Sequence, residues 1–127
     1  MIIKGISGRI LRLQSAGHIA QFGEVTAVNG GEPFGYLAYY VKDGMFLSKL
    51  YLLKEFRGRG YSRLAVDMLK NVCKAKNLHR IWLQVDRKNT ESDKAYRALG
   101  FNVIYEYAAD IGEGYVMDDY FMELTVN

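Results

Sequence analysis

The chain has 127 residues, half of them apolar, and a formal net charge of +3 from 17 Lys and Arg against 14 Asp and Glu. This length and apolar content fit one domain, residues 1–127, with an ordinary core, and the small basic excess gives no sign of nucleic-acid binding. The single cysteine, Cys73, excludes an intramolecular disulfide and a cysteine-based zinc site, and with no signal peptide or membrane-length apolar run we expect a cytoplasmic protein that binds neither metal nor membrane.

The first half of the chain predicts strands. The first twenty residues mix isoleucine and leucine with glycine in a pattern that fits neither the helix nor the strand period, with a slight preference for strand. Beyond them, the turn dipeptides Asn29-Gly30 and Asp43-Gly44 separate segments rich in β-branched and aromatic residues. We therefore expect a three-stranded meander formed by residues 19–28, 36–41 and 45–53.

Two helices are predicted in the second half of the chain. After Gly60 the apolar residues recur at helical spacing, with charged residues between them, which predicts an amphipathic helix that ends near Asn77. Thr90 followed by Asp93 resembles a capping box, which predicts a helix that continues through Leu99 and ends at the next glycine.

The remaining strands complete the expected fold. They are residues 81–85, 103–107 and 116–124. The segment 47–85 should be a right-handed crossover that places two strands parallel. The fold class is therefore α/β (α+β), with a mixed, mostly antiparallel sheet, one parallel strand pair and helices on both faces.

The Arg-Gly-Arg-Gly-Tyr-Ser stretch at residues 57–62 lies where a strand ends and a helix begins. The first-turn amides of a helix lack internal partners and sit at the positive end of its dipole, so they can hold phosphate oxygens. The stretch adds glycines for close approach, arginines for positive charge and a small hydroxyl: Gly58, Gly60, Arg57, Arg59 and Ser62. A dinucleotide motif would need a glycine at Arg63, and a P-loop would need Gly-Lys-Ser/Thr, so both are disfavoured. The stretch indicates a phosphate site, with a ligand-free turn as the alternative.

Arg57, Gly60 and Ser62 fill a pattern that resembles the GCN5-related N-acetyltransferase (GNAT) family: Arg or Gln, two residues, Gly, one residue, then Gly or Ala. Serine at the last place is a small-residue departure. The second signature of the family also looks present, at Asn89, Ser92, Tyr96 and Gly100-Phe101. The resemblance covers residues 36–124, and residues 110–120 are similar to the bacterial branch that includes PaiA-type polyamine acetyltransferases.

The resemblance implies an N-acetyltransferase that moves the acetyl group of acetyl-CoA directly to a primary amine. Residues 48–53 look like the family's strand whose exposed backbone pairs with the pantetheine arm, and Leu52 or Leu53 would supply a backbone N–H for the oxyanion. Tyr96 would be the catalytic acid toward the departing thiolate. The residues implied to bind the cofactor are Tyr51, Leu52, Leu53, Arg57, Gly58, Arg59, Gly60, Tyr61, Ser62, Asn89, Ser92 and Tyr96.

One departure concerns the N-terminus. Family members usually begin with a strand and two helices, and residues 1–16 are too short for all three, so we expect shortened N-terminal elements in an atypical segment 1–17. Either the chain is a shortened version or a second subunit covers the gap, and a sheet edge left bare would favour a homodimer. The same departure motivates an alternative function, an acetyl-CoA-binding sensor without transfer activity.

An alkyl amine of pKa near 10.4 is neutral in only about one molecule in two thousand at pH 7, a penalty of roughly 4.6 kcal/mol, so a base is expected. The candidates, each of which also fits a solvated surface charge, are Asp86, Asp110, Asp118 and Asp119, which the sequence does not rank. His18 and His79 are weaker candidates. Cys73 lies in the middle of a predicted helix at the edge of its apolar stripe, which indicates a core residue rather than a nucleophile.

Acidic residues are concentrated in the last quarter of the chain, although the protein as a whole is basic. They are Glu106, Asp110, Glu113, Asp118, Asp119 and Glu123. They would attract a cationic acceptor such as a polyamine, another small cationic amine or the lysine of a peptide. A solvated strand edge explains the same residues.

Overall fold

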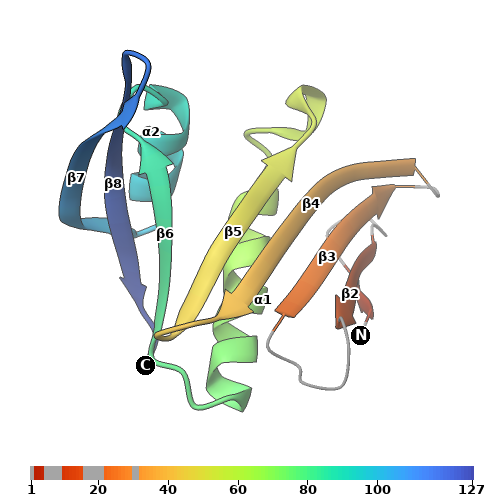
Figure 1. Ribbon diagram of the computed structural model, residues 1–127. Coiled ribbons are helices and arrows are strands. Elements are labelled where there is room, and N and C mark those ends of the chain that lie inside the picture. The colour runs from red at the N-terminus through yellow and green to blue at the C-terminus, as the bar shows by residue number, and fades with distance from the viewer. Residues whose placement is uncertain (1, 5–9, 16–21, 30–31) are drawn as a thin grey trace.

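The computed structural model describes residues 2–4, 10–15, 22–29 and 32–127. In chain order the elements are β1 (Ile2–Lys4), β2 (Ile10–Ser15), β3 (Phe22–Asn29), β4 (Glu32–Val41), β5 (Met45–Leu52), the 3-10 helix η2 (Lys54–Phe56), α1 (Tyr61–Ala75), β6 (Arg80–Asp86), α2 (Thr90–Ala98), β7 (Asn102–Gly112) and β8 (Tyr115–Thr125). The described strands form one sheet in the order β1-β2-β3-β4-β5-β6-β8-β7 (Figure 1). Its neighbouring pairs are antiparallel except for β5 and β6, which are parallel, as predicted.

The predicted meander is confirmed as β3, β4 and β5, and the short strands β1 and β2 precede it. Residues 19–21 and the second half of the Asn29-Gly30 turn lie outside the described residues. β4 begins earlier than predicted, at Glu32, and contains Pro33. A register shift beside that residue lets the strand continue, although proline cannot donate a hydrogen bond to the ladder.

Both helices are confirmed, but the predicted capping box at Thr90 and Asp93 is wrong. Asn89 is the N-cap of α2, and its Oδ1 accepts the backbone N–H of Ser92 at 3.2 Å. Asp93 instead accepts a hydrogen bond from Nε of Arg97 at 2.8 Å, one turn along the helix. Asparagine is among the best N-caps, so the helix begins one residue after it with its first-turn amides partly satisfied.

The sequence analysis leads us to expect helices on both faces of the sheet, whereas both described helices lie on one face. Arg63 of α1 donates a hydrogen bond to the carbonyl oxygen of Ala98 at the end of α2. The reason is topological: the connections from β5 to β6 and from β6 to β7 both move in the same direction across the sheet, so two right-handed crossovers place their helices on the same side. The core lies between this face and the helices, and its most deeply buried large side chains include Phe101, Met45, Leu69, Ile81, Leu83 and Met122.

The opposite face carries a row of aromatic rings across five strands. Its members are Tyr40, Phe46, Trp82, Phe121 and Tyr105, with neighbouring ring centroids between 4.5 and 6.4 Å apart. On β4, β5, β6 and β8 each ring is next to a buried core residue that points to the opposite face, as the pleat of a sheet requires. Neither helix in the described part of the chain is both long enough and apolar enough to span a bilayer.

Candidate active site

The parallel strands β5 and β6 are joined only at one end. Their register pairs are Met45 with Ile81 and Phe46 with Trp82, and beyond these pairs the strands diverge, as Figure 1 shows. Along the rest of β5, the side that faces β6 therefore has no partner strand. This leaves an opening in the sheet, bordered by backbone groups of β5 that have no partner strand.

Leu52 directs its backbone carbonyl into this opening. The N–H of the next residue, Leu53, points to β4 and donates to the carbonyl of Phe34 at 2.8 Å. The carbonyl of Leu52 points the other way and accepts a hydrogen bond from Nε of Arg57 at 3.0 Å. Because the N–H and C=O of one residue in an extended strand point to the same side, the N–H of Leu52 also faces the opening. Of the two residues predicted to supply an oxyanion donor, only Leu52 has the required direction.

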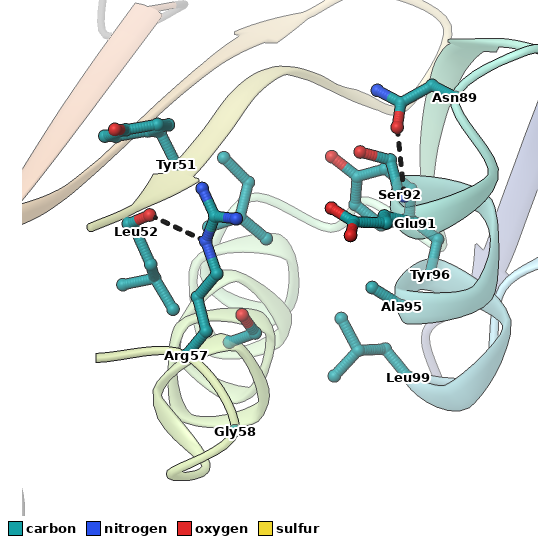
Figure 2. Close-up of a pocket in the computed structure, with 12 residues that line it drawn as sticks. Tyr51, Leu52, Arg57, Gly58, Asn89, Glu91, Ser92, Ala95, Tyr96 and Leu99 are labelled. Carbon is teal, nitrogen blue, oxygen red and sulfur yellow. Dashed lines mark hydrogen bonds between the residues drawn. The ribbon is translucent and has the colours of Figure 1, made fainter. Parts of the chain in front are cut away.

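A pocket of about 540 Å³ lies beside this edge, between β5, the beginning of α1 and the length of α2 (Figure 2). Its lining residues are Leu50, Tyr51, Leu52, Arg57, Gly58, Ser62, Asn89, Glu91, Ser92, Ala95, Tyr96 and Leu99. Two sequence segments that are far apart thus meet across one cavity. Both candidate signatures, the stretch at 57–62 and the segment from Asn89 to Tyr96, contribute to it.

The side of the pocket formed by the loop before α1 and its first turn, the α1 wall, has the properties of an anion site. Gly58 and Gly60 have φ of 74° and 86°, values that side chains disfavour, and an added Cβ at either glycine would meet no atom within 4 Å. Gly60 is the N-cap of α1 and provides no side-chain acceptor, and the first turn of the helix contains no acidic residue. No side chain caps this turn, so the N–H groups of Ser62 and Arg63 can bind a phosphate. The guanidinium of Arg57 lies further along the pocket, at Leu52 and Tyr51.

Four of the predicted cofactor-binding residues do not line the pocket, namely Leu53, Arg59, Gly60 and Tyr61. Tyr61 is buried and packs edge-on against Phe34 at 5.0 Å, so it anchors the loop to the core. Arg59 lies over the ring of Phe56, with its guanidinium carbon 5.5 Å from the centroid. The side chains of Tyr61 and Arg59 therefore contact aromatic rings of the protein and not the cavity.

The α2 wall carries the predicted signature residues Asn89, Ser92 and Tyr96. Since Oδ1 of Asn89 caps the helix, its amide Nδ2 is the group left to contact a ligand. Tyr96 packs edge-on against Phe101 with ring centroids 5.7 Å apart, and burial raises the pKa of its phenol above the ordinary value of 10.0. The phenol is therefore protonated at neutral pH and can donate a hydrogen bond into the pocket.

Sequence reasoning missed four lining residues, which are Leu50, Glu91, Ala95 and Leu99. The helix period contained the missing signal, because positions 92, 95, 96 and 99 share one helical face once Ser92 and Tyr96 are assigned to the site. Glu91 is the one carboxylate among the lining residues. It lies in the first turn of α2, where the helix dipole stabilises a negative charge.

None of the predicted general bases lines the pocket. Each of the four aspartates has a local hydrogen-bond donor in the described structure: Lys88 N–H for Asp86, Gly112 N–H for Asp110, Arg87 Nε for Asp118 and Gln84 Nε2 for Asp119. His79 is exposed in the loop before β6, and His18 lies outside the described residues. The assignment of a base to these residues therefore stays a prediction without support from the pocket.

Cys73 is a core residue, as predicted. It has no exposed surface, its Sγ lies 3.6 Å from Sδ of Met45, and burial raises the pKa of its thiol to about 11. A protonated thiol away from the pocket is a poor nucleophile. Within the ranges that the structure describes, no group of three or more His, Cys, Asp or Glu side chains gathers in a way that could hold a metal ion.

Residues 9–101 match the model of the acetyltransferase (GNAT) family. The chain therefore belongs to this family, and its class is that of the acetyl-CoA-dependent acetyltransferases. It is 25% identical over 117 residues to ribosomal protein bS18-alanine N-acetyltransferase of Haemophilus ducreyi, covering 81% of each chain.

Solved structures share the fold. A nourseothricin acetyltransferase superposes with a TM-score of 0.75 at 17% identity, over 84% of this chain and 66% of the other. The PaiA N-acetyltransferase of Thermoplasma acidophilum, crystallised with coenzyme A, superposes with a TM-score of 0.68 at 20% identity, over 83% of this chain and 61% of the other. The chain thus spans roughly three fifths to two thirds of the length of these two structures.

Proposed function

We propose that the pocket binds acetyl-CoA and that this chain transfers the acetyl group to a primary amine by direct attack. The observation that carries the proposal is the meeting of two walls across one cavity: the uncapped start of α1 with Arg57 on one side, and Tyr96 on the other. The free edge of β5 runs between them. A cofactor with a diphosphate at one end of an extended arm and a thioester at the other fits this arrangement.

Different residues along the pocket would bind different parts of the cofactor. The N–H groups from Gly58 to Ser62 and the guanidinium of Arg57 would hold the diphosphate. The backbone of β5 up to Leu52 and the free amide of Asn89 would pair with the amides of the arm. Gly58 supports the fit, because the space that a Cβ would take beside it is open.

Acetyl-CoA supplies an activated acetyl group, and transfer forms a C–N bond as the C–S bond breaks. The N–H of Leu52 would stabilise the negative charge that develops on the carbonyl oxygen. Tyr96 would hold its proton toward the sulfur. A phenol near pKa 10 that protonates a thiolate near 8.5 does so uphill by about 2 kcal/mol, and burial of Tyr96 increases the cost. A hydrogen bond, rather than complete proton transfer, is therefore its role.

For the acceptor we propose a small cationic amine such as a polyamine. The acidic residues of β7 and β8 support this choice. Glu106 and Asp118 pair with Arg87, and Glu123 pairs with Arg80. Three further acidic residues form no ion pair with a side chain of the described residues: Asp110, Glu113 and Asp119. The β7–β8 hairpin therefore has a net negative charge that can attract a cation.

A second candidate acceptor is the α-amine of an N-terminal alanine, favoured by the activity named for the Haemophilus ducreyi relative. An α-amine of pKa near 7.8 is neutral in roughly one molecule in seven at pH 7, a penalty of about 1 kcal/mol instead of roughly 4.6 for an alkyl amine. Such an acceptor needs little help from a base. The absence of the predicted aspartates from the lining of the pocket is compatible with it.

The test is release of free thiol from acetyl-CoA in the presence of diamines, polyamines, amino acids and peptides that begin with alanine. We expect turnover with at least one of them. With a polyamine, kcat/KM should keep rising up to about pH 10, whereas with an alanine peptide it should level off near pH 8. Calorimetric binding of the cofactor with no thiol release from any acceptor would instead identify a sensor without transfer activity. A homodimer and a cytoplasmic location stay predictions.

A further inference from the structure

Within α2, Tyr96 is the hydrophobic residue that packs against the core cluster. None of the residues in Thr90–Ala98 is fully buried, in contrast to α1, which buries seven. Besides the contacts of Tyr96 with Phe101 and of Arg97 with the ring of Tyr120, the position of such a helix depends on contacts at its ends. The first end is the cap at Asn89, and the second is the turn in which Leu99 and Phe101 enter the core.

A side chain from α1 reaches this second end. Nη2 of Arg63 donates a hydrogen bond to the carbonyl oxygen of Ala98 at 2.9 Å. Ala98 is the last residue of α2, where carbonyl groups lack intrahelical donors and the helix dipole is negative, so a guanidinium is well suited to this place. The bond therefore restrains α2 through a group that its own sequence does not supply.

Arg63 is next to the anion site in the sequence. Arg63 directly follows Ser62 in the first turn of α1, and Ser62 lines the pocket. Ala98 follows Tyr96 by two residues. The hydrogen bond thus connects the wall with the anion site to the wall with the phenol, although Arg63 is exposed and does not itself line the cavity.

We propose that Arg63 is a positioning residue that fixes the spacing between the anion site at 57–62 and Tyr96. The inference rests on the proposed function, because this spacing matters only when one molecule has its diphosphate at the loop and its sulfur at the phenol. Small displacements of a group that must meet a reacting atom reduce the rate strongly. Loss of the bond should therefore affect a donor that spans both walls more than a donor that contacts only one.

The test compares two acetyl donors in three variants. Acetyl-CoA spans both walls, whereas S-acetylpantetheine lacks the nucleotide and its diphosphate. Arg63→Met keeps an apolar side chain of similar length and removes the hydrogen-bond donors. Arg63→Lys keeps the positive charge and an N–H donor at the end of the side chain. Lys70→Met is the control: it removes a positive charge from the same helix at a residue that makes no hydrogen bond to α2 in the described structure. Thermal unfolding checks that each variant is folded, with an expected change of about 5 °C or less.

We expect Arg63→Met to lower kcat/KM about tenfold for acetyl-CoA and less than twofold for S-acetylpantetheine, with partial recovery in Arg63→Lys and no change in Lys70→Met. An equal loss with both donors, or no loss with either, would overturn the inference and leave the proposed function standing. Calorimetry with coenzyme A and the unmodified chain separates the two claims. If the unmodified chain fails to bind coenzyme A, the proposed function falls, and the inference falls with it.

Discussion

Tyr96 is the side chain on which the proposed chemistry depends most. Removal of its hydroxyl in Tyr96→Phe should leave the ring contact with Phe101 intact and lower kcat by about 10- to 100-fold. Because burial raises the pKa of the phenol, no loss of activity from its ionisation is expected below pH 10. Steady-state rates at saturating acetyl-CoA between pH 6 and 10 would check both statements.

Leu52 provides the matched control for this prediction. Its proposed role belongs to the backbone N–H, which Leu52→Ala preserves. The variant should therefore retain turnover better than Tyr96→Phe, even though it loses some packing against the core. The reverse order at saturating cofactor would contradict the roles given to both residues.

Cys73 gives a prediction about stability. Burial holds the native thiol at a pKa of about 11, against an ordinary value of 9.0, so the folded chain keeps a proton that the unfolded chain loses as the pH rises from 9 to 11. The contribution of this group to stability is complete below pH 9 and is lost as the pH rises through 11. Denaturant unfolding of the unmodified chain and of Cys73→Ala at pH 8, 9, 10 and 11 should show a smaller pH dependence in the variant.

The same variant tests the direct mechanism. Cys73→Ala should retain acetyl transfer, because the thiol lies in the core and not in the pocket. A complete loss of turnover in a folded variant would point to a covalent intermediate and contradict the account.

At the scale of elements, the turn before α1 depends on two glycines with different tasks. Gly58 and Gly60 both have positive φ and open space at the position of a Cβ, so alanine at either should cost about 1 kcal/mol of backbone strain. Only Gly58 lines the pocket. We predict similar losses in the free energy of unfolding for Gly58→Ala and Gly60→Ala, with a raised KM for acetyl-CoA only in Gly58→Ala. A raised KM in both variants would contradict this difference between the two glycines.

Most elements could be predicted from the sequence because their signals are local. The period of apolar residues in α1, the turn at Asp43-Gly44 and the glycine after α2 each fix one element without reference to distant residues. The error in the capping residue also has a local cause, unlike the error in the placement of the helices, which arises from the topology. Asn89 and Thr90 are both acceptable caps, and only the backbone shows which one begins the helix.

Two features of the site are not local, and the sequence alone could not supply them. The first feature is the direction of each side chain in the loop. Tyr61 packs against Phe34 and Arg59 lies over Phe56, and both contacts depend on where β4 and η2 lie. The set of acidic groups near the pocket is the other. Glu91 lines the cavity while Asp118 pairs with Arg87, and nothing in their spacing along the chain distinguishes them.

For the whole molecule, topology creates the site. β5 and β6 meet at only two register pairs, and the two crossovers that flank β6 place α1 and α2 on one face beside the resulting opening. Beside the opening, the backbone groups of β5 have no partner strand, so this edge can pair with the amides of an extended ligand. The family resemblance predicted an exposed backbone along residues 48–53, and the order of elements predicted the parallel crossover, whereas neither predicted that both helices lie on one face.

The central claim is that one extended cofactor lies across this opening with its ends at two defined places. The most direct measurement is a crystal structure of the chain with coenzyme A. The account predicts the diphosphate within hydrogen-bond distance of the backbone N–H groups between Gly58 and Ser62, the arm along β5, and the sulfur beside the phenol of Tyr96. A diphosphate bound away from that loop, or a Tyr96 ring turned from the sulfur into the core, would contradict it.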